Sequence, residues 1–556
     1  MQAIYNIAEI CYQKGLNEAV LSPGSRCAPL TLALVRHKGI KTRTISDERA
    51  AAFTALGIAQ QTCKPSILLC TSGTAVYNYA PAVAEAFFQH IPLLILTADR
   101  PQEWIAQQDG QTIFQENIFG KHVKKSYSLP ADYSHPDSKW FIERTVNEAI
   151  NLSQRYPAGP VHINVPLREP LYSETPISFD TSVKIFETLP SRPSLTTPAR
   201  EGLMKILASA GKVLIIAGQH QENSILKSRL AKISRECRIP VIADIISNLH
   251  GEDFIQNHDL FLSNTITDQL KPNVLITFGQ SVISKSLKTF LRNNKPGIHF
   301  HIDPAAQAAD TFQSLTGIVE EFPEDFFNAF DNSYTNSESF YQFWKDLSVK
   351  GNTVLTNFLH QQKSFSELEL THTILEELPD NSDLHLANSM PVRYANIIGL
   401  RNKFIRVFAN RGTSGIDGVI STAYGGALVS GKITTVLTGD LSFFYDRNAW
   451  WNNYRPDNLK IILFNNHGGN IFRIIDGPGK QAELDEYFET IQKQSAENTA
   501  KDFNLNYFFC NSTSKLMEGL KNLYSTPDPA ILEIETSGKI NAEVFAEFNH
   551  FLKSNF

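Results

Sequence analysis

Two short polar motifs in the last quarter of the chain carry residue types that bind metal ions. They are residues 439–442 (Gly-Asp-Leu-Ser) and residues 465–469 (Asn-Asn-His-Gly-Gly). Asp440 and Asn466 are 26 residues apart (466 − 440), and each follows an apolar run that is typical of a β-strand. Because neighbouring parallel strands end at the sheet edge where α/β proteins bind ligands, we expect both side chains at that edge.

These motifs supply three oxygen ligands of different kinds. A carboxylate from Asp440, an amide oxygen from Asn466 and the carbonyl of Gly468 suit a small hard cation such as Mg²⁺, or Mn²⁺ in its place. Such a cation takes its remaining ligands from water and from bound phosphates. We expect His467 to point away from it. The alternative is a pair of ordinary turns, since Gly, Asp and Asn are common turn residues.

Composition and charge exclude several classes of function. The chain has 556 residues, of which 42% are hydrophobic and 19% charged, which is enough for three or four folded domains. A net charge of −6 gives no basic surplus for nucleic acid or an anionic membrane. The six cysteines form no C-x-x-C pair, which argues against a disulfide framework or a zinc site. With no signal peptide and no membrane-length apolar run, a cytoplasmic enzyme is expected.

Apolar strand-like runs alternate with helical stretches, which favours parallel α/β sheets. A Pro-, Ser- and Thr-rich stretch over 173–200 reads as an interdomain linker. We predict helices over 48–61, 75–89 and 337–350, and strands at 19–21, 66–70, 92–96, 161–165, 213–217, 240–245, 274–278, 298–302, 405–408, 434–437, 461–464 and 531–534. The pattern therefore predicts three consecutive doubly wound parallel-sheet domains, over 1–180, 195–345 and 360–556.

Glu48 stands where a short strand changes to a long Ala-rich helix in the first domain. An acid there stabilises a helix through its dipole, so a purely structural role is the alternative. The Gly-Asp…Asn-Asn spacing, however, resembles the thiamine diphosphate (ThDP) signature, and the three domains resemble the Pyr–middle–PP order of ThDP decarboxylases. That resemblance implies that Glu48 shares a proton with N1′ of the aminopyrimidine, which requires a desolvated carboxyl group.

Seven segments together resemble one family, the 2-succinyl-5-enolpyruvyl-6-hydroxy-3-cyclohexene-1-carboxylate synthases of menaquinone biosynthesis. The resemblance covers essentially the whole chain and is loosest in the middle domain. It implies a transferase that uses ThDP and Mg²⁺ to decarboxylate 2-oxoglutarate, and then adds the succinyl carbanion equivalent to isochorismate by conjugate addition. The segments are residues 22–26 (Ser-Pro-Gly-Ser-Arg), 47–49, 71–75, 97–101, 410–418, 439–442 and 465–469.

The resemblance also implies the residues of the site. Ile416 props the bent cofactor, and the other cofactor contacts are Gly439, Leu441, Ser442, Asn470, Ile471 and Phe472. Both substrates carry two carboxylates, which arginine binds well through its planar fork. The implied substrate residues are Ser25, Arg26, Arg100, Gln111, Lys285, Ser389, Arg393, Arg411 and Ile475. The alternative for any single arginine is a surface ion pair.

One position departs from the family. A second basic residue often follows the middle-domain lysine, whereas Ser286 follows Lys285 in this chain. Lys288, about one helical turn further on, is the candidate replacement. If neither serves, the isochorismate side of the site is altered while the ThDP side is not.

ThDP enzymes with this layout set Glu48 of one subunit against the partner subunit's Asp440, so we expect a homodimer or homotetramer. One alternative function is another ThDP-dependent 2-oxo acid decarboxylase or carboligase of the acetolactate-synthase type, which needs fewer cations. Another is a non-catalytic nucleotide-binding protein. The absence of G-x-G-x-x-G and G-x-x-x-x-G-K-[ST] from the sequence argues against the latter.

Overall fold

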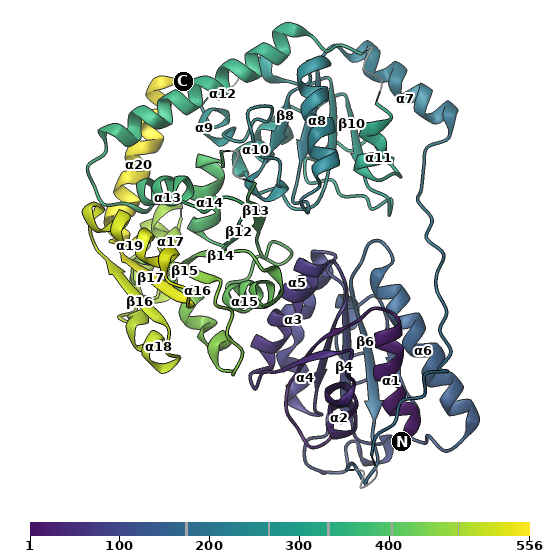
Figure 1. Cartoon of the computed structure of the whole chain (residues 1–556). Coiled ribbons are helices and arrows are strands. Elements are labelled where there is room, and N and C mark those ends of the chain that lie inside the picture. The colour runs from purple at the N-terminus through teal and green to yellow at the C-terminus, as the bar shows by residue number, and fades with distance from the viewer. Residues whose placement is uncertain (173–175, 265–266, 331–333, 402–403, 476) are drawn as a thin grey trace.

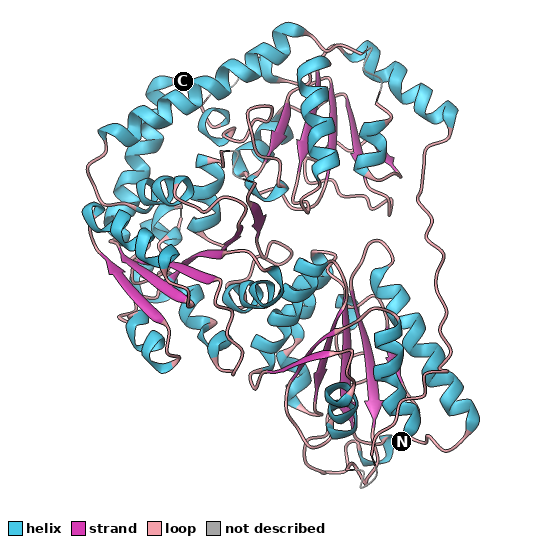
Figure 2. Ribbon diagram, in the orientation of Figure 1, coloured by secondary structure: helices cyan, strands magenta, loops and turns pink. Residues whose placement is uncertain are grey.

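The computed structural model describes residues 1–556 except 173–175, 265–266, 331–333, 402–403 and 476. The described strands form three sheets of six, five and six strands, and all of their pairings are parallel. Figure 2 shows helices packed around each group of strands. The predicted α/β class with three consecutive parallel-sheet domains is therefore confirmed. No described helix has the length and apolar character needed to cross a membrane.

The first sheet has the strand order β2-β1-β3-β4-β6-β5 and is covered on both faces. Successive strand residues face opposite sides, so Leu68 joins the core under α3 while Leu69 joins the core under α1 and α6. The strands are β1 (Glu18–Leu21), β2 (Lys41–Thr44), β3 (Ser66–Cys70), β4 (Leu93–Asp99), β5 (Ser126–Ser128) and β6 (Pro160–Pro166). The helices are α1 (Gln2–Gln13), α2 (Ala28–Arg36), α3 (Glu48–Thr62), α4 (Thr74–Asn78), α5 (Ala80–Phe88) and α6 (Pro136–Gln154).

The second sheet has the order β11-β10-β9-β7-β8. Its longest helix, α12, packs Trp344 into this domain and Phe358 into the core of the third, so one helix joins two domains. The strands are β7 (Val213–Ala217), β8 (Val241–Ala243), β9 (Val274–Phe278), β10 (Ile298–Ile302) and β11 (Gly317–Val319). The helices are α7 (Thr197–Ala210), α8 (Ser224–Glu236), α9 (Asp259–Leu262), α10 (Lys285–Asn293), α11 (Pro323–Asn328) and α12 (Glu338–Gln361).

The third sheet has the order β13-β12-β14-β15-β17-β16. Its central strands β14 and β15 are almost entirely buried. Strand β15 has an apolar run from Ile461 to Phe464, whereas β14 combines Val436 and Leu437 with buried threonines. The strands are β12 (Asp383–Leu386), β13 (Arg406–Phe408), β14 (Thr434–Gly439), β15 (Leu459–Asn465), β16 (Asn506–Cys510) and β17 (Ala530–Glu535). The helices are α13 (Glu367–Glu376), α14 (Met390–Ile398), α15 (Val419–Ser430), α16 (Asp440–Tyr445), α17 (Ile471–Ile474), α18 (Ala496–Asp502), α19 (Thr513–Ser525) and α20 (Gly538–Asn555).

Helix α3 of the first domain lies against α15 of the third (Figure 1). Two glycines make this close packing possible. A Cβ on Gly57 would stand 1.9 Å from the carbonyl oxygen of Thr422, and one on Gly425 would stand 2.0 Å from that of Thr54. Because α3 is buried between its own sheet and α15, it has no polar face along its central turns.

The predicted linker over 173–200 is only partly correct. Residues 173–175 lie outside the described part of the chain, and Val183 packs into the first core. Asn147 of α6 fixes the backbone of Lys184 and Phe186 by hydrogen bonds of 2.9 and 3.1 Å. The extended connection to the second domain is shorter than predicted, because α7 already begins at Thr197.

Two predicted helices also differ from the structure. The helix over 75–89 is two helices, because α4 ends at Asn78 and α5 begins at Ala80, with a proline in the first turn of α5. The helix over 337–350 continues to Gln361. The short strands β5, β11, β12 and β16 were not predicted, whereas β2 is the short strand expected before Glu48.

Candidate active site

The two polar motifs that are predicted to bind a metal ion meet at the carboxyl edge of the third sheet. Strands β14 and β15 are parallel neighbours, with Gly439 opposite Phe464, which confirms the predicted arrangement. Asp440 begins α16 and Asn466 directly follows β15. The N–H of Gly468 donates to Asn466 Oδ1 at 3.2 Å and also hydrogen-bonds the Asp440 carboxylate. A single donor thus brings the two oxygen ligands together.

Asp440 is buried, and its carboxylate has two further donors. Gln492 Nε2 donates to Oδ2 at 2.7 Å, and the N–H of Leu441 donates to Oδ1 at 2.8 Å. Burial raises the pKa of Asp440 to about 6. A bound cation would oppose that effect, because an adjacent positive charge favours the ionised carboxylate.

Asn466 is held by a residue that the sequence motifs did not indicate. Its Nδ2 donates at 2.7 Å to Oε1 of Glu367, the first residue of α13. Thr536 and Asn541 donate to the same oxygen at 3.0 and 2.9 Å. Burial raises the pKa of Glu367 to about 7. Glu367 and Gln492 lie far from the motifs in sequence, and neither has a local signal beyond the acid in the first turn of a helix.

The chemistry of this donor set fits a Mg²⁺–diphosphate group. Among the described residues there is no cluster of three His, Cys, Asp or Glu side chains, so the protein ligands of a cation must include neutral oxygens. Asn470, just before α17, buries both its amide oxygen and its amide nitrogen without a hydrogen-bond partner. Buried amides need partners, and a diphosphate with its waters offers them. His467 Nε2 pairs with Glu535 at 3.1 Å.

The loop over 410–418 is fixed from two sides. Asn388 Nδ2 donates to the carbonyls of Asn410 and Gly415 at 2.8 and 2.7 Å, and Arg411 donates back to Asn388 Oδ1 at 2.9 Å. The carbonyl of Ile416 accepts from Ser442 Oγ at 2.9 Å. Ser442 lies on α16, the helix that Asp440 opens, so this bond ties Ile416 to the metal side of the sheet.

The first domain also contributes an anchor for this loop. The buried carboxylate of Glu85, on α5, accepts from the N–H groups of Gly412 and Thr413 at 2.7 and 2.6 Å. Ile416, three residues beyond Thr413, keeps 37% of its surface exposed. The loop is therefore rigid at its base and presents a bulky apolar side chain, as the predicted support for ThDP requires.

Three cations gather where the second and third domains meet. Burial lowers the pKa of Arg393, on α14, and the nearby Arg411 lowers it further. Burial also lowers the pKa of Lys288, on α10, although Asp244 opposes this shift, and Arg411 and Arg393 lower it further. Arg411 Nε is buried without a partner. Grouped like charges with an unpaired donor are suited to an anion.

The other predicted residues of these elements lie beside this group. Ser389 precedes α14, and its carbonyl accepts from the Arg393 guanidinium. Lys285 begins α10 with an exposed side chain, whereas Ser286 hydrogen-bonds Ser263 at 2.8 Å. Lys288 Nζ donates to the carbonyl of Val282 at 2.6 Å, which holds it against the turn before α10.

Arg26 and Arg100 form a second cationic pair, at the carboxyl edge of the first sheet. Arg26 is buried. Its guanidinium donates to the carbonyl of Leu167 at 3.0 Å and lies 3.6 Å from the Glu169 carboxylate. Arg100 pairs with Asp109 at 2.9 Å. Arg100 is close enough to lower the pKa of Arg26, after the larger effect of burial. The companions Ser25 and Gln111 are exposed. No hydrogen bond or ion pair among described residues joins this pair to Arg393 and Arg411.

Glu48 is the first residue of α3, and its neighbours hold the helix end in place. Asp47 caps the helix through the N–H of Ala50 at 3.1 Å and accepts from Asn448 of the third domain at 2.8 Å. Arg49 donates to the carbonyl of Tyr445 at 2.6 Å. The half-buried Glu48 carboxylate has a weak contact of 3.5 Å to Asn78. Its surroundings within one chain therefore leave it accessible.

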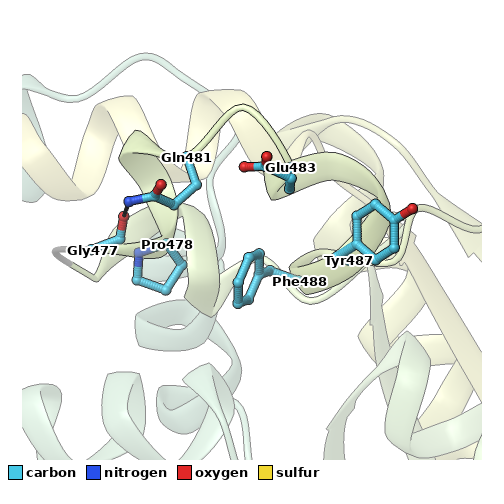
Figure 3. Close-up of a pocket in the computed structure, with 6 residues that line it drawn as sticks. All are labelled: Gly477, Pro478, Gln481, Glu483, Tyr487 and Phe488. Atoms are coloured by element: carbon cyan, nitrogen blue, oxygen red, sulfur yellow. Dashed lines mark hydrogen bonds between the residues drawn. The ribbon is translucent and has the colours of Figure 1, made fainter.

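A hollow of about 610 Å³ follows α17, lined by Gly477, Pro478, Gln481, Glu483, Tyr487 and Phe488 (Figure 3). The Phe488 ring lies 6.0 Å from that of Phe472, and Ile475 is 43% exposed nearby in sequence. The N–H of Gly469 donates to the carbonyl of Glu489 at 2.6 Å, which ties this segment to the metal loop. The lining is largely apolar, so it suits the apolar part of a ligand better than a carboxylate.

Comparison with protein families identifies the class first. Residues 1–123 match the N-terminal TPP-binding domain of thiamine pyrophosphate enzymes, and residues 192–386 match the middle domain of that class. Thiamine pyrophosphate is another name for ThDP. With three parallel sheets and paired loops at the edge of the third, the protein is a thiamine pyrophosphate enzyme.

Curated relatives then specify the family. A 2-succinyl-5-enolpyruvyl-6-hydroxy-3-cyclohexene-1-carboxylate synthase from Cytophaga hutchinsonii is 44% identical over 561 residues, covering 100% of both chains. Synthases of the same name from Flavobacterium psychrophilum and Porphyromonas gingivalis are 41% and 36% identical, and cover 98% of this chain and 97% and 96% of their own lengths. The chain belongs to the 2-succinyl-5-enolpyruvyl-6-hydroxy-3-cyclohexene-1-carboxylate synthase family.

Proposed function

We propose that this enzyme decarboxylates 2-oxoglutarate and transfers the remaining succinyl unit to isochorismate by 1,4-addition, with release of CO2, as a cytoplasmic step of menaquinone biosynthesis. The names of the full-length relatives support the product. The observation that carries the chemistry is the pairing of Asp440 and Asn466 around the N–H of Gly468 at one sheet edge. That edge is where a cofactor diphosphate and its cation would be held.

In this proposal Asp440, Asn466 and the carbonyl of Gly468 hold Mg²⁺ or Mn²⁺. The buried unpartnered amide of Asn470 and the N–H groups near Ser442 and Ile471 would hold the diphosphate. The remaining cofactor contacts would come from Gly439, Leu441, Ile416 and Phe472. When bound, ThDP supplies the electron sink that lets a 2-oxo acid lose CO2 and donate its acyl unit.

Glu48 would hold a proton at N1′ of the aminopyrimidine. It is accessible in a single chain, and its helix end is fixed by contacts of its neighbours with the third domain. We propose that Glu48 serves a cofactor bound mainly by the partner subunit, so that the working unit is a dimer. A second copy would also desolvate the Glu48 carboxyl group, which is the condition for holding its proton near neutral pH.

The basic residues would bind and orient the four substrate carboxylates. Arg393 and Arg411, with Ser389, form one group, and Arg26 and Arg100, with Ser25 and Gln111, form the other. A dimer would bring the two groups to one site from different subunits. We propose that Lys285 and Lys288 hold an isochorismate carboxylate, since Lys288 lies beside Arg411 while Ser286 is engaged with Ser263. Ile475 and the largely apolar lining of the hollow beyond it would exclude water from the apolar parts of the substrates.

The test is isochorismate consumption by the purified chain with 2-oxoglutarate, ThDP and Mg²⁺, each omitted in turn. We expect consumption to require all of them, and pyruvate to be a poor donor. CO2 release without loss of isochorismate would support another ThDP-dependent 2-oxo acid decarboxylase instead. No reaction with either substrate, although ThDP binds, would overturn the substrate assignment.

A further inference from the structure

A closed hydrogen-bond network lies behind the metal ligand Asn466. Its centre is Oε1 of Glu367, which accepts from Asn466 Nδ2 at 2.7 Å, Asn541 Nδ2 at 2.9 Å and Thr536 Oγ1 at 3.0 Å. The N–H of Glu367 donates in return to Asn541 Oδ1 at 3.0 Å. Glu367, Asn541 and Thr536 are buried. The network joins the start of α13, the end of β17 and the start of α20 to the metal loop.

The orientation of the Asn466 amide follows from its two partners. Oε1 of Glu367 accepts from three side-chain donors, and a backbone N–H only donates. Since Glu367 accepts from Nδ2 and the N–H of Gly468 donates to Oδ1, the amide can take only one of its two flipped orientations. That orientation turns Oδ1 toward Gly468 and Asp440, where the metal ligands meet. A flipped amide would set Oδ1 against the carboxylate.

Glu367 has no cation beside it in the described structure. Its hydrogen-bond partners are all neutral. Asp440 raises the pKa of Glu367 further, after the larger effect of burial. Two buried acids with neutral hydrogen-bond partners thus lie on either side of Asn466, and a divalent cation bound there would favour the ionised form of both. A buried carboxylate at this position has no structural advantage over a neutral acceptor, because burying an unpaired charge costs free energy.

We propose that Glu367 is a positioning residue for the cofactor metal, which fixes the Asn466 amide with Oδ1 toward the cation. This inference rests on the proposed metal site. It does not require Glu367 to touch the cation, ThDP or either substrate. Such outer partners set the orientation and basicity of the residues that bind a metal directly, and their loss typically costs 10–100-fold in metal affinity.

The test measures Mn²⁺ binding to the full-length chain in the presence of ThDP, from the electron paramagnetic resonance signal of free Mn²⁺. We expect E367Q to weaken Mn²⁺ binding about 10- to 100-fold, and turnover at saturating Mn²⁺ and ThDP to change much less. E369Q is the matched control, since Glu369 lies on the same helix without a hydrogen bond to the metal loops, and it should bind as wild type does.

A second variant separates positioning from a general loss of structure. In N466D the new carboxylate would face Glu367, and the two would repel. E367Q should then improve Mn²⁺ binding in the N466D background, although it weakens binding in the wild-type background. A merely structural role for Glu367 predicts weaker binding in both.

Three results would count against the inference, and they are distinguishable. Normal Mn²⁺ binding by E367Q, or weaker binding in both backgrounds, would overturn the positioning role while leaving the proposed site intact. Failure of the wild-type chain to bind Mn²⁺ with ThDP would overturn the metal site itself. If E367Q does not fold, T536V decides, because it removes one neutral donor to the same oxygen. It should weaken binding a few-fold, and unchanged binding would refute the proposal.

Discussion

Glu48 differs from the acids around it, because Asp47 and Glu85 are bound by N–H groups while Glu48 has a weak contact alone. A proton-holding role predicts that E48Q loses at least about 100-fold in turnover, as expected when a positioned acid–base group is removed. The variant should still fold and bind ThDP with Mn²⁺, because Glu48 has no hydrogen bond that stabilises α3. Isochorismate consumption and cofactor binding measure the two effects.

The control for E48Q is E201Q, an exposed acid on α7. It should leave both turnover and cofactor binding unchanged. Near-normal turnover by E48Q would contradict the proposed role. Glu48 would then be a structural residue whose negative charge interacts favourably with the dipole at the start of α3.

Lys288 gives a second prediction for a single residue. Its substitution by methionine, K288M, keeps the apolar stem and removes the charge. We expect the KM for isochorismate to rise about 10-fold or more, the usual size of a charge-assisted hydrogen bond to a carboxylate. CO2 release from 2-oxoglutarate alone should change little.

K295M is the matched variant for K288M, since Lys295 is exposed beyond the end of α10. Measuring KM for each substrate separates binding from loss of fold. A rise in the KM for 2-oxoglutarate instead would assign Lys288 to the other substrate.

Asp446 is a buried acid outside the metal loops, and it predicts a pH effect. Burial raises the pKa of Asp446 to about 7, although Ser421 donates to it through its N–H and its hydroxyl. The folded chain therefore keeps a proton that the unfolded chain loses near pH 4. Its contribution to the free energy of unfolding falls as pH rises between these two pKa values.

D446N has no such proton to lose. The melting temperature of wild type relative to D446N should therefore fall between about pH 4 and about pH 7. D502N, which changes an exposed acid on α18, should show no comparable pH-dependent difference. A constant difference between wild type and D446N over this range would contradict a raised pKa for Asp446.

At the scale of elements, sequence reasoning was most reliable where burial is most complete. Strands β3, β7, β9 and β10 match their predicted bounds. A mostly apolar run, or in β10 an alternation of apolar residues with histidine, favours a strand when turn signals lie on either side. Strand β12 was missed because it contains Asp383 and His385, which are buried by specific partners. Arg406 pairs with Asp383 at 2.7 Å, and the His385 ring stacks on Phe408.

The residues of the candidate site also fall into two groups, those that a local motif indicates and those that only tertiary contacts bring there. The proposed metal ligands Asp440 and Asn466 lie in local motifs, so their positions follow from strand order. Glu367, Gln492 and Asn388 reach the site through tertiary contacts over 23 to 99 residues of separation, and no short pattern encodes them. The proposed boundary of the first domain at 180 is similarly blurred, because Val183 still packs on its core.

The crossing of α3 and α15 gives a prediction at this scale. G57A would bring a methyl group within 1.9 Å of the Thr422 carbonyl oxygen, so the helices must separate. Overpacking of this kind typically costs about 1–3 kcal/mol. We expect a lower melting temperature and reduced turnover, because the end of α3 carries Glu48.

The control for G57A is G202A on α7, where a Cβ meets nothing within 4 Å. Alanine is the better helix former, so G202A should be as stable as wild type or slightly more stable. Unchanged melting and turnover in G57A would show that the crossing tolerates a wider separation.

At the scale of the whole molecule, the distribution of catalytic groups predicts an assembly. The two arginine pairs are not joined within one chain, and Glu48 lies open at the end of α3. Exposed aromatic side chains also occur in the first domain, at Tyr77, Trp104 and Phe114, and on the hollow after α17, at Tyr487. A homodimer, or a homotetramer built from two such dimers, would cover these surfaces and unite the groups.

Mixing of two inactive variants tests this assembly directly. E48Q lacks the proton-holding group and D440N lacks the metal carboxylate, so each homodimer has two dead sites. In a mixed dimer, one site combines both defects, while the other combines the intact Glu48 of the D440N subunit with the intact Asp440 of the E48Q subunit. A shared site therefore predicts recovery of activity, to about a quarter of wild type for random pairing of equal amounts in a two-fold dimer. If each chain built its own site, no pairing could restore Glu48 and Asp440 together, and the mixture would stay inactive.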